Sequence, residues 1–294
     1  MPIYTNYYIP HSINDVFKVL DGQTPDKVRL IAGGTDLLLD LQQGRHPPLE
    51  SLVDVTQIPD LQKLEQNQDK LLIGAAVPLR KITNSVLVQK GATALAEATG
   101  LIGGPQVRNS ATLGGNVAHA LPAGDGTISL VALGATALVA TKSEIREVPM
   151  LELFEGPGIT RLRLCEEFLV GFVVPVADKY QASSFKRVMR PQGVALPIVN
   201  MAVWLQRSED KIADVRIAVG PAGPTPQRGF AAEDVLRGRR FEAETIRDGL
   251  KALLESVHFR TSPQRGTAKY RRHLCGVLFG DTLRSAWERT FDHA

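Results

Sequence analysis

The chain has 294 residues, of which 44% are hydrophobic and 22% are charged, and its formal net charge is +3. This composition is that of an ordinary globular protein with about two domains, and the charge is too small to indicate nucleic-acid binding. The sequence opens without a cationic leader and contains no run of about 18 apolar residues. We therefore expect a soluble, cytoplasmic protein without an integral membrane segment.

The first 56 residues have a strand–helix–strand pattern. Ser12, followed by Asp15, indicates a capped helix that ends near Gly22. The run "VRLIAGG" (28–34) predicts a strand that enters a glycine turn, and a short helix should begin after Thr35 or Asp36. "SLVDVT" (51–56) predicts the next strand, so these elements form a right-handed βαβ unit.

The pattern changes after residue 56. We expect strands at "KLLIGAA" (70–76), "ATALVAT" (135–141) and "EEFLVGFVVP" (166–175), with helices over about 85–99 and 127–134. Residues 176–184 resemble a linker. Three strands (185–191, 197–206, 212–220), a proline and glycine loop (220–229) and two helices (242–257, 264–290) should follow. The chain is thus predicted to be α+β, divided into 1–56, 57–177 and 178–294.

Two pairs of adjacent glycines stand out. Gly33 and Gly34 lie in "LIAGGTDLLLDLQQG", and Gly114 and Gly115 lie in "TLGGNVAHALPAGDG". Glycine accepts positive φ and exposes its backbone N–H, so consecutive glycines can surround one oxyanion without a cation. The chain contains neither GxxxxGKS/T nor GxGxxG, which disfavours a P-loop or a Rossmann site. An ordinary tight turn is the alternative for each pair, but two matching turns favour one shared phosphate site.

Both glycine segments resemble those of a known family. "AGGTDLL" (32–38) and "QVRNSATLGGNVAHALPAGD" (106–125) are similar to the two FAD-binding signatures of the medium, flavin-carrying subunit of the molybdenum hydroxylases. "EEFLVGFVVP" with "SSFKRV", and later "TAKYRRHLCGVLFGDTL", extend the resemblance over most of the chain. It implies a two-subdomain FAD-binding fold of the PCMH/vanillyl-alcohol-oxidase type, followed by a small α+β domain with a three-stranded antiparallel sheet and helices.

The resemblance also implies roles for particular residues. It places nine residues around the FAD pyrophosphate and the adjoining ribose or ribityl group: Ala32, Gly33, Gly34, Thr35, Asp36, Thr112, Gly114, Gly115 and Asn116. Asp125 matches an aspartate that contacts the flavin nucleotide, Leu169 a leucine at the isoalloxazine ring, and Lys186 a flavin-proximal lysine. A carboxylate can accept hydrogen bonds from sugar hydroxyls, and an ammonium group can favour the reduced flavin. Because the first turn holds neither His nor Cys, we expect non-covalent FAD.

The family resemblance further implies partner subunits. FAD would receive electrons from a 2Fe–2S subunit, which takes them from a molybdopterin subunit, in a dimer of heterotrimers. This chain would pass them to an external acceptor, with no catalytic acid or base of its own. Cys165 and Cys275 stand far apart in the sequence, so we expect no metal ion or cluster in the chain itself. Two isolated cysteines also disfavour the 4-hydroxybenzoyl-CoA reductase branch, in which this subunit carries a cluster.

Alternatives remain open at this stage. The chain could be a self-contained FAD oxidoreductase with its own organic substrate, or a non-catalytic nucleotide-binding subunit. His119 could approach the flavin, and Arg108 could contact the pyrophosphate or a partner, although an ordinary structural role suits each. The basic run between Arg260 and Asp281 contains no acidic residue. It fits a solvated helix face or docking to an acidic protein better than nucleic-acid binding.

Overall fold

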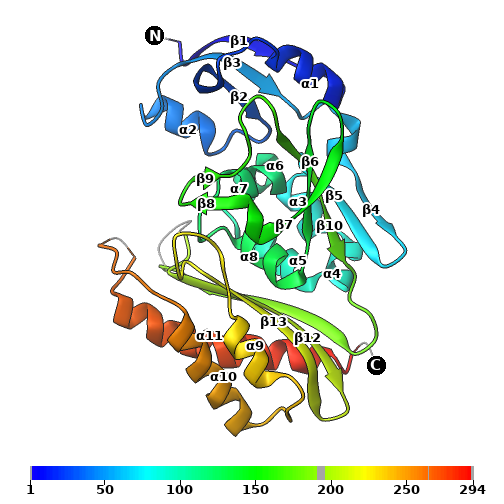
Figure 1. Ribbon diagram of the computed structural model, residues 1–294, viewed down its shortest axis with the longest axis vertical. Coiled ribbons are helices and arrows are strands. Elements are labelled where there is room, and N and C mark those ends of the chain that lie inside the picture. Colours follow the sequence, from blue (N-terminus) through cyan, green and yellow to red (C-terminus); the bar gives the residue numbers. More distant parts are fainter. Residues whose placement is uncertain (1, 191–195, 264, 293–294) are drawn as a thin grey trace.

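The computed structural model describes residues 2–190, 196–263 and 265–292. Figure 1 shows three parts stacked along the long axis: a small N-terminal sheet with two helices, a middle sheet with several short helices, and a C-terminal sheet covered by helices. Helices and strands alternate irregularly in all three parts, which confirms the predicted α+β class.

The N-terminal part is built on a three-stranded parallel sheet. Its strand order is β1 (Tyr4–Tyr8), β3 (Leu49–Asp54), β2 (Val28–Ile31), with helices α1 (Ile13–Leu20) and α2 (Leu37–Gln42). Ser12 begins α1 as predicted, because its hydroxyl accepts a 3.1 Å hydrogen bond from the backbone N–H of Asp15. Strand β1 was not predicted, because its central residues are all exposed and polar or aromatic.

The middle part contains a five-stranded antiparallel sheet. Its order is β4 (Leu64–Asn67), β5 (Lys70–Gly74), β10 (Phe168–Pro175), β6 (Thr136–Ala140), β7 (Ile145–Pro149), and a hairpin of β8 (Phe154–Gly156) and β9 (Ile159–Thr160) lies apart from it. Six helices pack nearby: α3 (Leu79–Thr83), α4 (Val86–Gly91), α5 (Thr93–Leu101), α6 (Pro105–Ser110), α7 (Leu113–Ala118) and α8 (Asp125–Leu133). The single helix predicted over 85–99 is therefore wrong: non-helical backbone at Ala92 divides it into α4 and α5.

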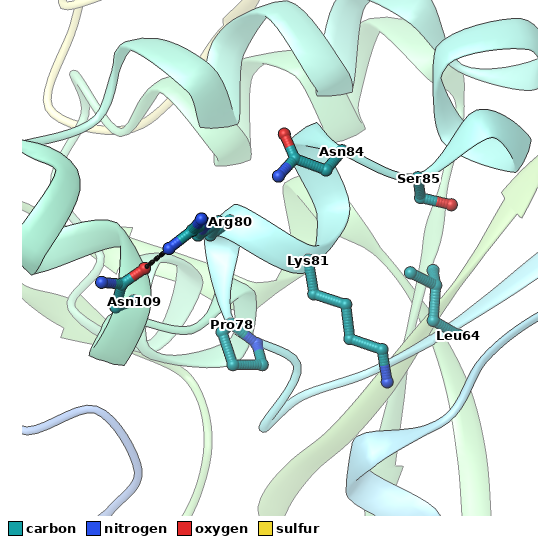
Figure 2. A pocket seen from close by; sticks show the side chains of 7 residues that line it. All are labelled: Leu64, Pro78, Arg80, Lys81, Asn84, Ser85 and Asn109. Carbon is teal, nitrogen blue, oxygen red and sulfur yellow. Dashed lines mark hydrogen bonds between the residues drawn. The ribbon is translucent and has the colours of Figure 1, made fainter.

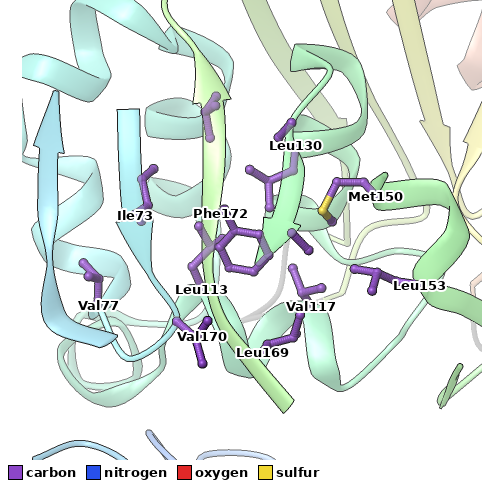
Figure 3. Packing of buried hydrophobic residues seen from close by; sticks show 14 of the residues in the cluster. Ile73, Val77, Leu113, Val117, Leu130, Met150, Leu153, Leu169, Val170 and Phe172 are labelled. Atoms are coloured by element: carbon purple, nitrogen blue, oxygen red, sulfur yellow. The ribbon is translucent and has the colours of Figure 1, made fainter. Parts of the chain in front are cut away.

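Central strand β10 and helices α7 and α8 share one apolar core. Figure 3 shows Phe172 of β10 surrounded by side chains that include Leu113 and Val117 of α7 and Leu130 of α8. All nine residues of α8 are buried. This packing fixes the positions of the segments that precede α7 and α8, and those segments carry most of the second predicted signature.

The C-terminal part has a four-stranded antiparallel sheet in the order β11 (Gln181–Val188), β12 (Val199–Ser208), β13 (Lys211–Gly220), β14 (Gln227–Arg228). The two-residue β14 lies in the predicted loop and extends the expected three-stranded sheet. Helices α9 (Phe230–Leu236), α10 (Ala243–Ser256) and α11 (Ala268–Arg289) cover it. Within the predicted elements, Pro191 and Gln264 lie outside the described residues.

The two faces of this last sheet pack against different neighbours. Phe185, Ala202 and Trp204 belong to the core shared with the middle part, whereas Met201 and Val203 belong to the core under α9 to α11. Alternation along the strands thus assigns every second side chain to the middle part. Over the described stretch of chain, no helix is both long and apolar enough to cross a membrane.

Candidate functional site

The two glycine segments meet in space, at the junction of the N-terminal and middle parts. A Cβ atom placed on Gly33 would lie 2.2 Å from the carbonyl oxygen of Ser110 and 2.7 Å from the Cα of Ala111. Real Cβ atoms do not come this close to backbone, so only glycine permits the contact. The predicted juxtaposition of the two signatures is therefore present, and it rests on one backbone-to-backbone contact.

The first segment has the backbone of a nest. Gly34 has φ of +67°, the left-handed conformation that glycine adopts without strain. The backbone N–H groups of Gly33, Gly34, Thr35 and Asp36 donate to no group within the described residues. Four consecutive free donors in a turn form a concavity suited to phosphate oxygens. Asp36 begins α2 as predicted, but its side chain makes no capping bond, so its exposed carboxylate is available to a ligand hydroxyl.

The second segment is a helix, so the prediction of a second glycine turn there is wrong. Thr112 begins α7 by accepting a 3.1 Å hydrogen bond from the N–H of Gly115, and neither Gly114 nor Gly115 has positive φ. Gly114 is needed for packing, since a Cβ there would lie 2.6 Å from the Cβ and carbonyl oxygen of Ala75. Gly115 is exposed. Thr112 caps the helix, and the helical backbone places Gly114 against Ala75, where only a residue without a Cβ fits.

The backbone donors from Leu113 to Asn116 are already used. The N–H of Leu113 donates to Val77, that of Gly114 to Ala75 and that of Asn116 to Thr112. What this segment offers is a bare backbone surface at Gly115 and the side chain of Asn116. The Oδ1 atom of Asn116 is buried without a hydrogen-bond partner among the described residues. Such atoms are uncommon in native proteins and point to a missing polar partner.

Asp125 lies at the start of α8 and is 3% exposed. One carboxylate oxygen accepts a 2.6 Å hydrogen bond from Nδ2 of Asn200, and the other accepts from the guanidinium of Arg187. Burial raises the pKa of Asp125, and the nearby charge of Arg187 and the Asn200 hydrogen bond oppose that rise. The carboxylate is thus engaged with the C-terminal part in this structure, and not directed at the glycine segments.

Leu169 and Lys186 come from two different strands. Leu169 of β10 is 7% exposed and belongs to the core shown in Figure 3. Lys186 of β11 pairs with Met201, whose side chain lies in the core under α9 to α11. Strand alternation therefore places Lys186 on the sheet face opposite to Asp125, and Arg187 on the same face as Asp125. Sequence reasoning missed Arg187, because alternation separates it from Lys186 but does not show which face of β11 meets the middle part.

Other candidate residues have structural partners. Arg108 donates to the carbonyl oxygens of Ile102 and Gly103, at 3.2 and 2.6 Å, and so closes the loop after α5. His119 ends α7. Burial raises the pKa of the Cys275 thiol to about 12. In the described ranges, no group of three or more His, Cys, Asp or Glu side chains is arranged to hold a metal ion.

A hollow of about 580 Å³ adjoins the second segment. Figure 2 shows its lining residues, which include Arg80 and Lys81 of α3 and Asn109 of α6, with Arg80 donating to Oδ1 of Asn109 at 3.1 Å. Pro78, which also lines it, pairs with Thr112 through an isolated β-bridge. None of the twelve residues implied by the resemblance lines this hollow, so the glycine junction and the hollow are neighbouring but separate features.

Two known families match most of the chain. Residues 3–177 match the family "FAD binding domain in molybdopterin dehydrogenase", and residues 183–286 match "CO dehydrogenase flavoprotein C-terminal domain". Both glycine segments, Asp125 and Leu169 fall in the first match, whereas Lys186 and Arg187 fall in the second.

Similar proteins extend over nearly the full length. The chain is 28% identical to the carbon monoxide dehydrogenase medium chain of Hydrogenophaga pseudoflava, covering 98% of this chain and 99% of that one. It is 33% identical to the nicotine 6-hydroxylase medium subunit of Paenarthrobacter nicotinovorans, covering 97% and 98%. Its structure matches carbon monoxide dehydrogenase from Hydrogenophaga pseudoflava with a TM-score of 0.92, 28% identity and coverage of 98% and 99%. It matches quinoline 2-oxidoreductase from Pseudomonas putida 86 with a TM-score of 0.89, 26% identity and coverage of 97% and 98%.

Proposed function

We propose that this chain accepts electrons from an iron–sulfur subunit and delivers them to an external acceptor. The chain belongs to the molybdopterin dehydrogenase flavoprotein family, as the FAD-carrying medium subunit. The observation that carries the proposal is the row of four backbone donors from Gly33 to Asp36 that have no partner among the described residues, in a turn that contacts Ser110 of the second segment through Gly33. This arrangement fits the pyrophosphate of a dinucleotide without a bound cation.

We propose that the two segments hold FAD in different ways. Ala32 to Asp36 would donate backbone hydrogen bonds to the pyrophosphate, with the Asp36 carboxylate on a sugar hydroxyl. Thr112 to Asn116 would form the opposing wall, where Gly115 allows close approach and Asn116 supplies a polar side chain. When bound, FAD supplies the redox chemistry, and this chain orients it and sets its exposure and electrostatic surroundings. We expect non-covalent FAD, because the first segment holds neither His nor Cys.

We further propose the division of the chain into 1–56, 57–177 and 178–294. The change of sheet after β3 and again after β10 supports these boundaries. FAD would lie between the first two subdomains, and Leu169 would approach the isoalloxazine ring from β10.

The partners are part of the same proposal. As a medium subunit, the chain acts within a multi-subunit complex, and we propose a 2Fe–2S small subunit and a molybdopterin large subunit, arranged as a dimer of heterotrimers in the cytoplasm. The medium chains of relatives are named for enzymes of unlike substrates, such as carbon monoxide and nicotine, yet each resembles this chain over nearly its full length. We therefore propose that the choice of organic substrate lies outside this chain.

The test uses the full chain, alone and with its partners. Purified alone, the chain should be yellow, with one FAD and without stoichiometric iron or molybdenum in elemental analysis. Mixing it anaerobically with the chemically reduced iron–sulfur subunit of its own complex should bleach the flavin absorbance rapidly. If the flavin is instead reduced rapidly in the isolated chain by the organic substrate of the complex, the chain is a self-contained oxidoreductase. A colourless chain that binds no FAD would leave only a nucleotide-binding or scaffold role.

A further inference from the structure

Three arginines lie close together where helix α11 begins. Arg260 and Arg265 belong to the loop between α10 and α11, and Arg271 is the fourth residue of α11. Burial increases in that order, because Arg260 is exposed, Arg265 is partly buried and Arg271 is only 2% exposed. In Figure 1 this region is the orange start of α11, at the end of the helix away from the C-terminus of the chain. The three side chains thus span the range from surface to interior.

The loop is folded back onto the first turn of the helix. The hydroxyl of Thr261 accepts a 3.1 Å hydrogen bond from the backbone N–H of Ala268, and Ser262 pairs with Gly266 through an isolated β-bridge. Side chains on a helix tilt toward its N-terminus, so the side chain of Arg271 is directed back at this loop. The arginine of the helix and those of the loop therefore converge on the N-terminal end of α11.

The electrostatic surroundings of these arginines are unfavourable. Burial and the charges of Arg265 and Arg260 all lower the pKa of Arg271, and burial and the charge of Arg260 lower the pKa of Arg265. In the described part of the chain, no carboxylate is among the charged groups that act on either one. The N-terminus of a helix carries the positive end of its dipole, which also repels a cation. Each of these effects would be reversed by an anion.

Arg271 also lacks hydrogen bonding that a buried guanidinium needs. Its Nε has no hydrogen-bond partner within the described ranges. Buried charges are normally paired, and an unpaired one is strongly destabilising. The buried Glu233 of the same C-terminal part follows this rule, since it forms ion pairs with both Arg228 and Arg237. The contrast indicates that the cluster at the start of α11 lacks an anionic partner.

The chemistry of the cluster fits a phosphate group. A guanidinium presents its N–H donors in a planar fork that matches the oxygens of phosphate or carboxylate. The start of a helix offers backbone donors to the same anion, and the N–H of Lys269 in the first turn has no partner among the residues that the structure describes. Three cations and a helix dipole together favour the doubly charged phosphate over a carboxylate.

We propose that Arg260, Arg265 and Arg271, with the N-terminus of α11, form a binding site for a phosphate group. The guanidinium of Arg271 would hold the phosphate at the base of the site, and the two loop arginines would enclose it toward solvent. The bound anion would replace mutual repulsion with attraction and tie the loop to the helix. The site shares no residue with the glycine junction, so this inference does not rest on the proposed function.

The test uses the FAD-loaded chain, so that the proposed pyrophosphate site is already occupied. Isothermal titration with inorganic phosphate should show binding, and phosphate should raise the unfolding temperature by about 2 °C or more relative to chloride at equal ionic strength. Titration with adenosine monophosphate distinguishes two sources of the same group. Binding of both probes indicates that the site accepts an organic phosphate, and binding of inorganic phosphate alone indicates that it takes the free ion. An equal rise in acetate would overturn the assignment to phosphate.

Helix α11 offers a matched pair of substitutions, Arg271→Gln and Arg284→Gln. Both remove one positive charge, but Arg284 is exposed and lies further along the helix. Arg271→Gln should raise the phosphate dissociation constant by about tenfold or more, and Arg284→Gln should change it by less than about twofold. In chloride, Arg271→Gln should unfold at no lower a temperature than wild type, because it removes a repelled buried cation. A fall of equal size in chloride and in phosphate would show a purely structural role and overturn the inference.

Folding and the proposed function are controlled separately. If Arg271→Gln does not fold, Arg265→Gln takes its place, and it should also weaken phosphate binding. Equal phosphate affinity in wild type and in the variants of the cluster would contradict the inference, as would a wild-type chain that binds no phosphate. A wild-type chain that binds no FAD would contradict the proposed function alone, and the same phosphate titrations would then be made on the chain as purified.

Discussion

The two glycine pairs are similar in sequence but have different roles in the structure. Gly33 and Gly34 form a turn with a positive φ at Gly34, and their backbone donors have no partner in the described part of the chain. Gly114 and Gly115 lie inside helix α7, where the cap at Thr112 and the contacts of the helix use the donors. The first pair supplies hydrogen bonds to an anion, whereas the second pair supplies close packing and a bare surface.

The comparison shows that a glycine can be required for two separate reasons. Gly34 is required for its φ, Gly33 and Gly114 for the space that a Cβ would occupy, and Gly115 for neither. Substituting the four positions one at a time separates stability from ligand binding. A pair in which both glycines behaved identically would contradict the assignment.

Gly114→Val should have the largest effect, on the fold itself. A Cβ at this position would overlap buried Ala75 at 2.6 Å, where neighbouring backbone cannot move aside. We expect a loss of about 3 kcal/mol or more in the free energy of unfolding, which is the upper range for overpacking. Urea denaturation of the apoprotein measures it. A variant as stable as wild type would show that α7 does not rest on Ala75.

Gly33→Val should abolish FAD binding while most of the chain remains folded. The clash with Ser110 would separate the N-terminal subdomain from the middle one, and so open the junction between the two segments. We expect an increase on the order of a hundredfold or more in the FAD dissociation constant, with far-ultraviolet circular dichroism unchanged. If the variant retained stoichiometric FAD, this junction would not be part of the FAD-binding site.

Gly34→Ala should have an intermediate effect. An L residue at φ of +67° costs about 1 kcal/mol or more, whereas the nearest atoms to the added Cβ are flexible ends of Ile31 and Leu38. Thermal unfolding should show this loss, and FAD affinity should fall by about tenfold if the nest shifts. Gly44→Ala is the matched control, since Gly44 also has positive φ but nothing near its Cβ. It should lose similar stability and keep its FAD affinity.

Gly115→Ala should have the smallest effect on stability. Its nearest neighbour would be Oγ1 of Thr112 at 3.3 Å, and alanine favours helix over glycine by about 1 kcal/mol. We expect the free energy of unfolding to stay within about 1 kcal/mol of wild type. Isothermal titration with FAD then isolates the role of the bare surface. Weaker binding at unchanged stability supports the opposing wall, and unchanged binding places FAD away from Gly115.

Much of the local structure was predictable from particular residues. Ser12 and Asp15 predicted the start of α1, and the glycine after the apolar run at 28–31 predicted the first turn. Strands β12 and β13 and the two long helices of the C-terminal part followed from apolar alternation and helical spacing, whereas β11 begins at Gln181, inside the predicted linker of 176–184. The order of strands and helices predicted the α+β class and the family resemblance predicted the FAD-binding function, and the comparisons confirm both.

The sequence by itself determined these elements because capping, alternation and turn chemistry act between residues that are close along the chain. Only the tertiary structure decided that Gly114 and Gly115 are helical, since that depends on the distant Ala75. It also decided that Arg187 and not Lys186 faces Asp125, because which face of β11 meets the middle part is set by the packing of two cores. A contact between residues far apart in the chain depends on how whole layers stack, and no local pattern encodes it.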